Sequence, residues 1–89
     1  MTYIVWYADG TAEDIVTDEP MSLEKMQELV GGYIEMATRK DDLSDHMLVF
    51  NEEGIIIGLP VNQKFPYIVG NVIEGKMADG EDGREFVGF

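Results

Sequence analysis

Residues 21–37 read MSLEKMQELVGGYIEMA, the one stretch of this 89-residue chain with a sustained helical period. Its apolar side chains recur at steps of three and four residues, which places them on one face of a helix. The segments around it have the composition of short strands and turns, so the sequence predicts one helix that covers a sheet. The apolar positions are Leu23, Met26, Val30, Tyr33, Ile34 and Ala37.

The start of this helix is well marked, but its interior holds one anomaly. Ser22 is a suitable N-cap, and Met21 and Met26 are spaced for a hydrophobic staple. Gly31 and Gly32 are unexpected, because each glycine inside a helix costs about 1 kcal/mol relative to alanine. Close packing of the helix backbone on the sheet, or a bend, would explain them. The alternative is a bare backbone surface left for a ligand or partner.

The remaining segments predict strands. Residues 2–8 are aromatic and β-branched, and Asp9-Gly10 signals a two-residue type I′ hairpin turn. Residues 11–17 would pair back as an edge strand protected by Glu13 and Asp14. Residues 46–51 and the apolar residues 55–59 would form a second hairpin, with 55–59 as a central strand.

The rest of the chain completes the predicted sheet. Residues 67–74 and 84–89 would add strands, residues 41–45 a polar connection, and residues 75–83 a mobile acidic segment. We therefore predict a single α+β domain over residues 1–89, with one helix packed on a mostly antiparallel sheet of about five strands.

Charge and composition exclude several classes of function. The chain has 18 acidic and 6 basic residues and a formal net charge of −12. Direct binding to nucleic acid or to an anionic membrane is not expected, because both rest on lysine and arginine. No cysteine is present, so we expect neither disulfides nor a thiolate nucleophile. The sequence shows no signal peptide and no membrane-spanning run, which favours the cytoplasm.

The polar residues do not form a recognisable catalytic or metal-binding pattern. His46 is the only histidine and is expected at the surface where a strand begins. The glycine-rich acidic segment 79–83 lacks the ligand spacing of a calcium loop. We therefore expect a protein that is not an enzyme and uses no metal or cofactor. The candidate partner-binding residues are the acidic pairs Glu13 and Asp14, Asp18 and Glu19, and Glu52 and Glu53.

Three runs of sequence resemble a known family. They are LVGGYIE at residues 29–35, NEEGIIIGLPVN at 51–62 and IVGNVI at 68–73. Together they resemble a small domain of unknown function found in bacteriophages and prokaryotic mobile elements. The resemblance covers about half of the chain and leaves the N-terminal hairpin with Trp6 outside. It carries no activity to transfer, but it implies an accessory protein that binds a host factor or a defence component.

Two functions follow from these observations. The leading hypothesis is a non-enzymatic acidic protein, in the cytoplasm of the host cell, that modulates or inhibits a host or defence protein. Its carboxylates would mimic nucleic acid at a basic site, and its oligomeric state stays open. The alternative is an oligomeric protein that sequesters a nucleotide-like small ligand. Backbone and amide groups for that ligand would come from Gly31, Gly32, Gly58, Asn62 and Asn71.

Overall fold

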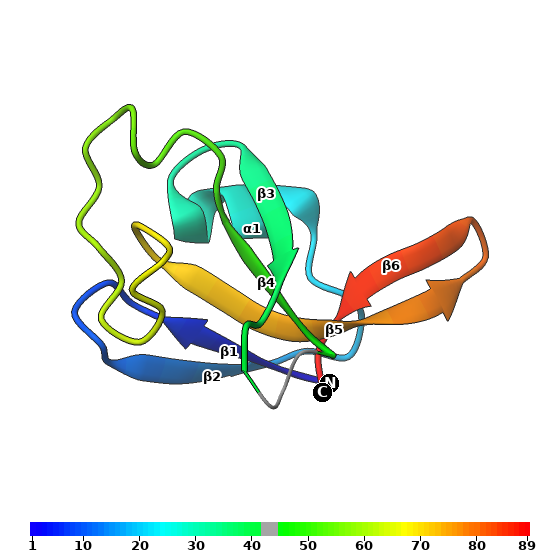
Figure 1. Cartoon of the computed structure of the whole chain (residues 1–89). Coiled ribbons are helices and arrows are strands. Elements are labelled where there is room, and N and C mark those ends of the chain that lie inside the picture. The colour runs from blue at the N-terminus through cyan, green and yellow to red at the C-terminus, as the bar shows by residue number, and fades with distance from the viewer. Residues whose placement is uncertain (42–44) are drawn as a thin grey trace.

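The structure is a computed structural model that describes residues 1–41 and 45–89. Within these ranges one helix and six strands are found, and all strand pairs are antiparallel (Figure 1). The predicted polar connection over residues 41–45 falls largely outside them. The elements are β1 (Thr2–Trp6), β2 (Ala12–Val16), α1 (Leu23–Val30), β3 (Ile34–Thr38), β4 (His46–Asn51), β5 (Val72–Gly80) and β6 (Gly83–Val87).

The sheet is built around β5, its longest strand. The strand order is β2-β1-β5-β4-β3, and β6 also pairs with β5. Residues 72–74 of β5 pair with β1 and residues 76–80 with β6, so β1 and β6 share one edge of β5 while β4 occupies the other. The backbone N–H groups of Thr2 and Phe89 each donate to the other residue's carbonyl oxygen at 2.7 Å, which joins the two ends of the chain.

The two faces of the sheet are covered differently. Helix α1 lies over one face (Figure 1), where Met26 and Val30 pack in a core with Val5, Val49 and Ile73. The other face is covered by part of the β4–β5 connection, residues 52–71, which forms a second core. Its buried members are Leu48 and Val72 from the sheet and Phe65 and Ile68 from the connection.

Several local predictions are confirmed. β1 and β2 form the first hairpin with β2 at the edge of the sheet, and residues 46–51 form a strand. Ser22 caps α1 by accepting a hydrogen bond from the Lys25 N–H at 3.1 Å. The first turn differs from the prediction, because Gly10 alone has positive φ there, and Tyr7 and Thr11 flank a three-residue loop.

The prediction of a long helix on a sheet of about five strands is wrong. The sheet has six strands in the described part of the chain, and α1 ends at Val30. Gly31 is left-handed, with φ 84°, and its N–H donates to the Gln27 carbonyl oxygen at 2.8 Å, which ends the helix. The second half of the predicted helix is β3. The glycine pair is therefore a helix terminus rather than an anomaly inside a helix.

The prediction for the second hairpin is also wrong. Residues 55–59 form turns outside the sheet, because β3 and β5 already occupy both edges of β4. The strand predicted at 67–74 begins only at Val72, and the segment predicted to be mobile, residues 75–83, belongs largely to the β5–β6 hairpin. The apolar run at residues 55–57 is therefore left on the surface.

Candidate partner-binding surface

The predicted residues Glu13 and Asp14 point to opposite faces of the sheet. Glu13 pairs with Val5 on the α1 face, and Asp14 pairs with Ile4 on the other face. The Glu13 carboxylate accepts a hydrogen bond from the Tyr7 hydroxyl at 2.9 Å. This bond, together with burial and the charge of Glu13, raises the pKa of Tyr7. The two adjacent acids therefore do not form one acidic patch.

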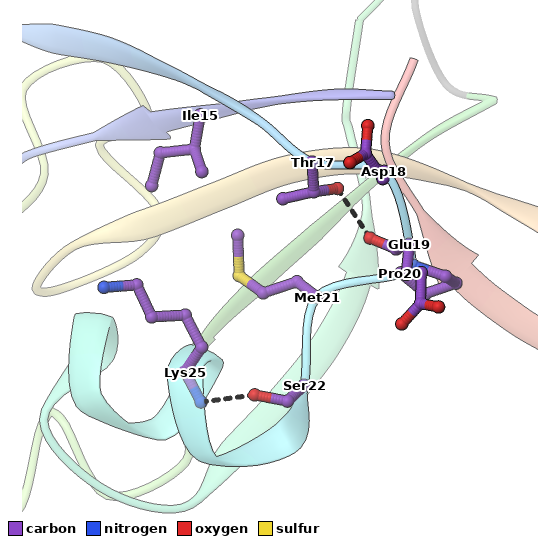
Figure 2. A pocket seen from close by; sticks show the side chains of 8 residues that line it. All are labelled: Ile15, Thr17, Asp18, Glu19, Pro20, Met21, Ser22 and Lys25. Carbon is purple, nitrogen blue, oxygen red and sulfur yellow. Dashed lines mark hydrogen bonds between the residues drawn. The ribbon is translucent and has the colours of Figure 1, made fainter.

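Asp18 and Glu19 line an open hollow of about 510 Å³ between the end of β2 and the start of α1 (Figure 2). The Thr17 hydroxyl donates to the Glu19 carbonyl oxygen at 2.6 Å. Figure 2 shows the two carboxylates pointing away from each other and away from the Met21 side chain. The hollow therefore does not gather the two charges.

Glu19 also borders a second, wider hollow at the β5–β6 hairpin. Its acidic lining adds Asp79, Glu81, Asp82 and Glu85, which are not among the predicted partner-binding residues. The Arg84 Nε atom lies 3.8 Å from Asp79 Oδ1, and both side chains are exposed. This part of the surface is a solvated acidic hairpin and offers no buried polar group to a ligand.

Glu52 and Glu53 follow directly after β4, at the start of the β4–β5 connection. This connection lies at the opposite end of the molecule from the tip of the β5–β6 hairpin (Figure 1). The Glu52 N–H donates to the Tyr33 carbonyl oxygen at 2.8 Å, and the Glu53 N–H donates to Asn51 Oδ1 at 2.7 Å. Glu52 and Glu53 are thus separated from the acidic residues of the β5–β6 hairpin. The six predicted residues do not make one surface.

Three consecutive isoleucines follow Glu52 and Glu53 and project into solvent. Ile55 and Ile56 are each 84% exposed and Ile57 is 54% exposed. Their turn is held by backbone hydrogen bonds, including Ile57 N–H to the Glu53 carbonyl oxygen at 3.0 Å. The buried Gly54 fixes the base of the turn, because a β-carbon there would lie 2.6 Å from Val69 Cγ2. The apolar side chains are therefore presented by an ordered turn.

A groove of about 120 Å³ runs between this turn and the edge of the sheet, and we call it the β3 groove. Tyr67 forms part of its wall and is itself held in place, because its hydroxyl accepts from the Lys40 N–H at 3.3 Å. The Lys40 ammonium lies 4.7 Å from the centre of the Tyr67 ring. The side chains that define the β3 groove are Glu35, Phe50, Glu52, Ile55, Ile56 and Tyr67.

A buried carboxylate lies on the same face of the sheet. Glu74 is 1% exposed, and its carboxylate contacts Trp6 Nε1 at 2.9 Å, Arg39 Nη1 at 2.8 Å and His46 Nδ1 at 2.6 Å. Burial alone would raise the pKa of Glu74, but the hydrogen bonds from His46, Trp6 and Arg39 outweigh it, and the pKa is lowered. We call these four residues the Glu74 cluster.

The Glu74 cluster connects β1, the end of β3, β4 and β5. A carboxylate hydrogen-bonded to an imidazole also occurs in catalytic sites. Here the same carboxylate also accepts hydrogen bonds from Arg39 and Trp6. His46 stands at the start of a strand as predicted, yet it is held by Glu74 and packs on Phe89 with ring centres 4.5 Å apart. No group of three His, Cys, Asp or Glu side chains in residues 1–41 and 45–89 could hold a metal ion.

The two asparagine side chains proposed to bind a small ligand, Asn62 and Asn71, make hydrogen bonds within the domain. Asn62 is fully buried, and its Nδ2 donates to the carbonyl oxygens of Trp6 and Gly70 at 3.1 and 2.9 Å. Asn71 Nδ2 donates to the Leu29 carbonyl oxygen at 3.1 Å, and its Oδ1 accepts from the Ala8 N–H at 3.0 Å. Both side chains join backbone segments. Gly58 lies in the isoleucine turn, whereas Gly31 and Gly32 follow α1.

Comparison with known proteins gives a family but no activity. A family model described as a domain of unknown function, DUF3846, matches residues 1–86. No curated protein and no solved structure matches the chain. The match includes the N-terminal hairpin with Trp6, which the motif resemblance left outside. In the part of the chain that the structure covers, no helix has the length and apolar character needed to span a membrane. The chain belongs to the DUF3846 family of domains of unknown function.

Proposed function

We propose that this domain is a non-enzymatic binding protein that engages a basic segment of another protein at the β3 groove. The observation that carries the proposal is the exposure of Ile55 and Ile56 on a turn that hydrogen bonds hold in place. Contiguous exposed apolar side chains of this kind mark interaction surfaces. Burying one isoleucine side chain against a partner contributes about 1.5–3 kcal/mol.

The charge of the groove indicates the chemistry of the partner. Glu35 and Glu52 line it, and Glu53 follows directly in the chain. The whole protein carries −12, so its field attracts a basic partner and raises the rate of association at low salt. Lys40 is a cation near the groove, and its ammonium lies over the Tyr67 ring. A segment with both lysine or arginine and apolar side chains complements this surface.

The partner we propose is a host or defence protein with a basic surface, bound in the cytoplasm of a prokaryotic host. The motifs that resemble phage and mobile-element proteins support this context. In the mimicry version, Glu35, Glu52 and Glu53 would occupy positions that nucleic-acid phosphates take in the partner's basic site. The proposal requires no direct contact with nucleic acid or membrane.

A quantitative pull-down tests the proposal. Wild-type protein and the double variant Ile55→Ser/Ile56→Ser are used as bait in a bacterial lysate, and captured proteins are quantified by mass spectrometry. Val16→Ser is the matched control, because Val16 is also exposed but lies on β2, at the other edge of the sheet.

The expected result is one basic partner that the wild type and Val16→Ser retain and the double variant loses. Its capture should weaken steeply as salt rises from about 0.05 to about 0.5 M, because salt screens exposed charges. Capture that survives the double substitution, or that salt does not change, contradicts the proposal.

A further inference from the structure

We infer that the partner segment binds in an extended conformation, as an additional strand on the free edge of β3. This inference rests on the proposed function and specifies how the partner is held. β3 is the last strand in the order β2-β1-β5-β4-β3, so in the described part of the chain only β4 pairs with it. Its other edge is open.

The hydrogen-bond register identifies which backbone groups face this open edge. The Tyr33 carbonyl oxygen accepts from the Glu52 N–H, and the Arg39 N–H donates to the His46 carbonyl oxygen at 3.0 Å. In an antiparallel pair such residues alternate with residues whose backbone groups point away from the partner strand. The backbone N–H and C=O groups of Ile34, Met36 and Thr38 therefore point outward and form a template for a new strand.

The two edges of the sheet differ in how they are protected. Proteins guard free edges with charges, prolines or bulges. The edge strand β2 carries Glu13 and Asp14 in five residues, whereas β3 carries only Glu35 and has no proline. β3 also exposes an apolar side chain, since Met36 is 43% exposed. An edge with this composition is suited to pairing.

The geometry of the sheet predicts the sequence pattern of the added strand. Its residues opposite Glu35 and Ala37 would lie on the face of the β3 groove, beside the carboxylate and the isoleucines. Its residues opposite Ile34 and Met36 would lie on the α1 face, beside exposed apolar surface. The segment should therefore alternate, with basic and apolar residues on the groove face and apolar residues on the other.

Charge favours a foreign segment over a second copy of this chain. Two copies joined through β3 would bring together two molecules that each carry −12. A basic strand gains electrostatic attraction at the same edge. The occupant we propose is therefore an extended basic segment of another protein.

N-methylated peptides test this inference directly. The probe is a labelled peptide of about ten residues that alternates arginine and valine, titrated by fluorescence anisotropy. Two further peptides carry N-methyl groups on alternate residues, in one register or the other. N-methylation removes a backbone donor and adds bulk, so one register should weaken binding at least about tenfold and the other much less.

Protein variants separate this inference from the proposed function. Met36→Pro removes an outward N–H but no hydrogen bond to β4, so it should weaken the peptide without unfolding the domain. If Ile55→Ser/Ile56→Ser abolishes peptide binding while N-methylation in either register leaves it unchanged, strand addition is overturned, but binding at the β3 groove is supported. If N-methylation in one register weakens binding and the isoleucine substitutions do not, binding at the β3 groove is overturned, but strand addition at the β3 edge is supported.

Two other results overturn strand addition. One is failure of the unmodified peptide to bind at about 1 mM, where even a weak contact of about −4 kcal/mol would be detected. The other is a stable dimer in sedimentation experiments that Met36→Pro dissociates, because a second copy would then occupy the edge. In both cases the pull-down still decides the proposed function separately.

Discussion

Replacing Glu74 by glutamine removes a negative charge from the buried face of the sheet and preserves the shape of the side chain. The carboxylate accepts from Trp6, Arg39 and His46, whereas a glutamine side chain has a single oxygen acceptor, and its amide must face one of the donors. The Arg39 side chain, which is 12% exposed, would lose its ion pair with residue 74 and keep the one with Asp41 at 2.8 Å.

The magnitude follows from these contacts. Breaking a buried ion pair costs about 3–5 kcal/mol, and hydrogen bonds to charged groups contribute about 1.5–3 kcal/mol each. Because Arg39 retains Asp41 and the glutamine oxygen still accepts, we expect a loss of about 3 kcal/mol in the free energy of unfolding. For a domain of this size that loss lowers Tm by roughly 12–24 °C.

Urea unfolding followed by circular dichroism measures the effect. Glu28→Gln is the matched control, since Glu28 forms an exposed pair with Lys25 at 3.9 Å and should contribute less than about 0.5 kcal/mol. A loss for Glu74→Gln no larger than that of the control would refute the structural role of the Glu74 cluster.

Acid titration tests the same cluster independently. The pKa of Glu74 is lowered below the ordinary 4.5, so its charged form stabilises the folded state. This stabilisation is fully present above pH 4.5 and is lost as the pH falls through the lower pKa of the folded state. The wild type should therefore lose more stability on acidification below pH 4.5 than Glu74→Gln does. Parallel pH dependences would contradict the assignment.

Three further substitutions test the fold and the surface. Gly75→Ala should destabilise by about 1–3 kcal/mol in urea unfolding, because its β-carbon would collide with the Val87 carbonyl oxygen and lie 2.8 Å from the Phe86 ring; unchanged stability would contradict the close approach of β6 to Gly75. Gly31→Ala should cost about 1–2 kcal/mol in thermal unfolding, because φ is 84° there; a neutral result would mean the helix ends differently. Ile56→Ser should change stability by less than about 0.5 kcal/mol while partner capture falls, since the side chain is exposed; a large loss of stability would place Ile56 in the core.

Local chemistry made part of the fold predictable. The aromatic and β-branched first strand, the position (but not the type) of the turn at Asp9-Gly10, and the Ser22 cap each depend on residues close in sequence. The end of the helix was misjudged because residues 33–37 fit two periods. Ile34 fits the helical stripe, but it also alternates with Met36 as in a strand. Gly31 decides between them, since a left-handed glycine ends helices far more often than it interrupts them.

The prediction of a strand at residues 55–59 was wrong for a non-local reason. Its composition suits a buried strand, but strand preference depends on packing within a sheet. The run can form such a strand only where a sheet edge is free to pair with it. Both edges of β4 are taken by strands other than this run, β3 before it in the chain and β5 after it. The run is left outside, and what appeared to be core became the candidate binding surface.

The candidate site was predictable only in part for the same reason. Glu52 lines the β3 groove and Glu53 lies beside it, whereas Glu13, Asp14, Asp18 and Glu19 lie elsewhere, because register and strand order place them. The Glu74 cluster had no sequence signal at all. Its members are residues 6, 39, 46 and 74, which meet only once four segments are assembled.

The Glu74 cluster and the free edge of β3 are linked by Arg39. In the described part of the chain β3 pairs with β4 alone, and this five-residue strand has further contacts near both ends. At its start, Asn51 Nδ2 donates to the Val30 carbonyl oxygen at 3.1 Å and packs against Gly32. Just beyond its end, Arg39 reaches across β4 to the buried carboxylate on β5. Ordering an edge before a partner arrives lowers the entropic cost of adding a strand. We therefore expect the buried ion pair to support the binding surface we propose, although neither Arg39 nor Glu74 lines the β3 groove.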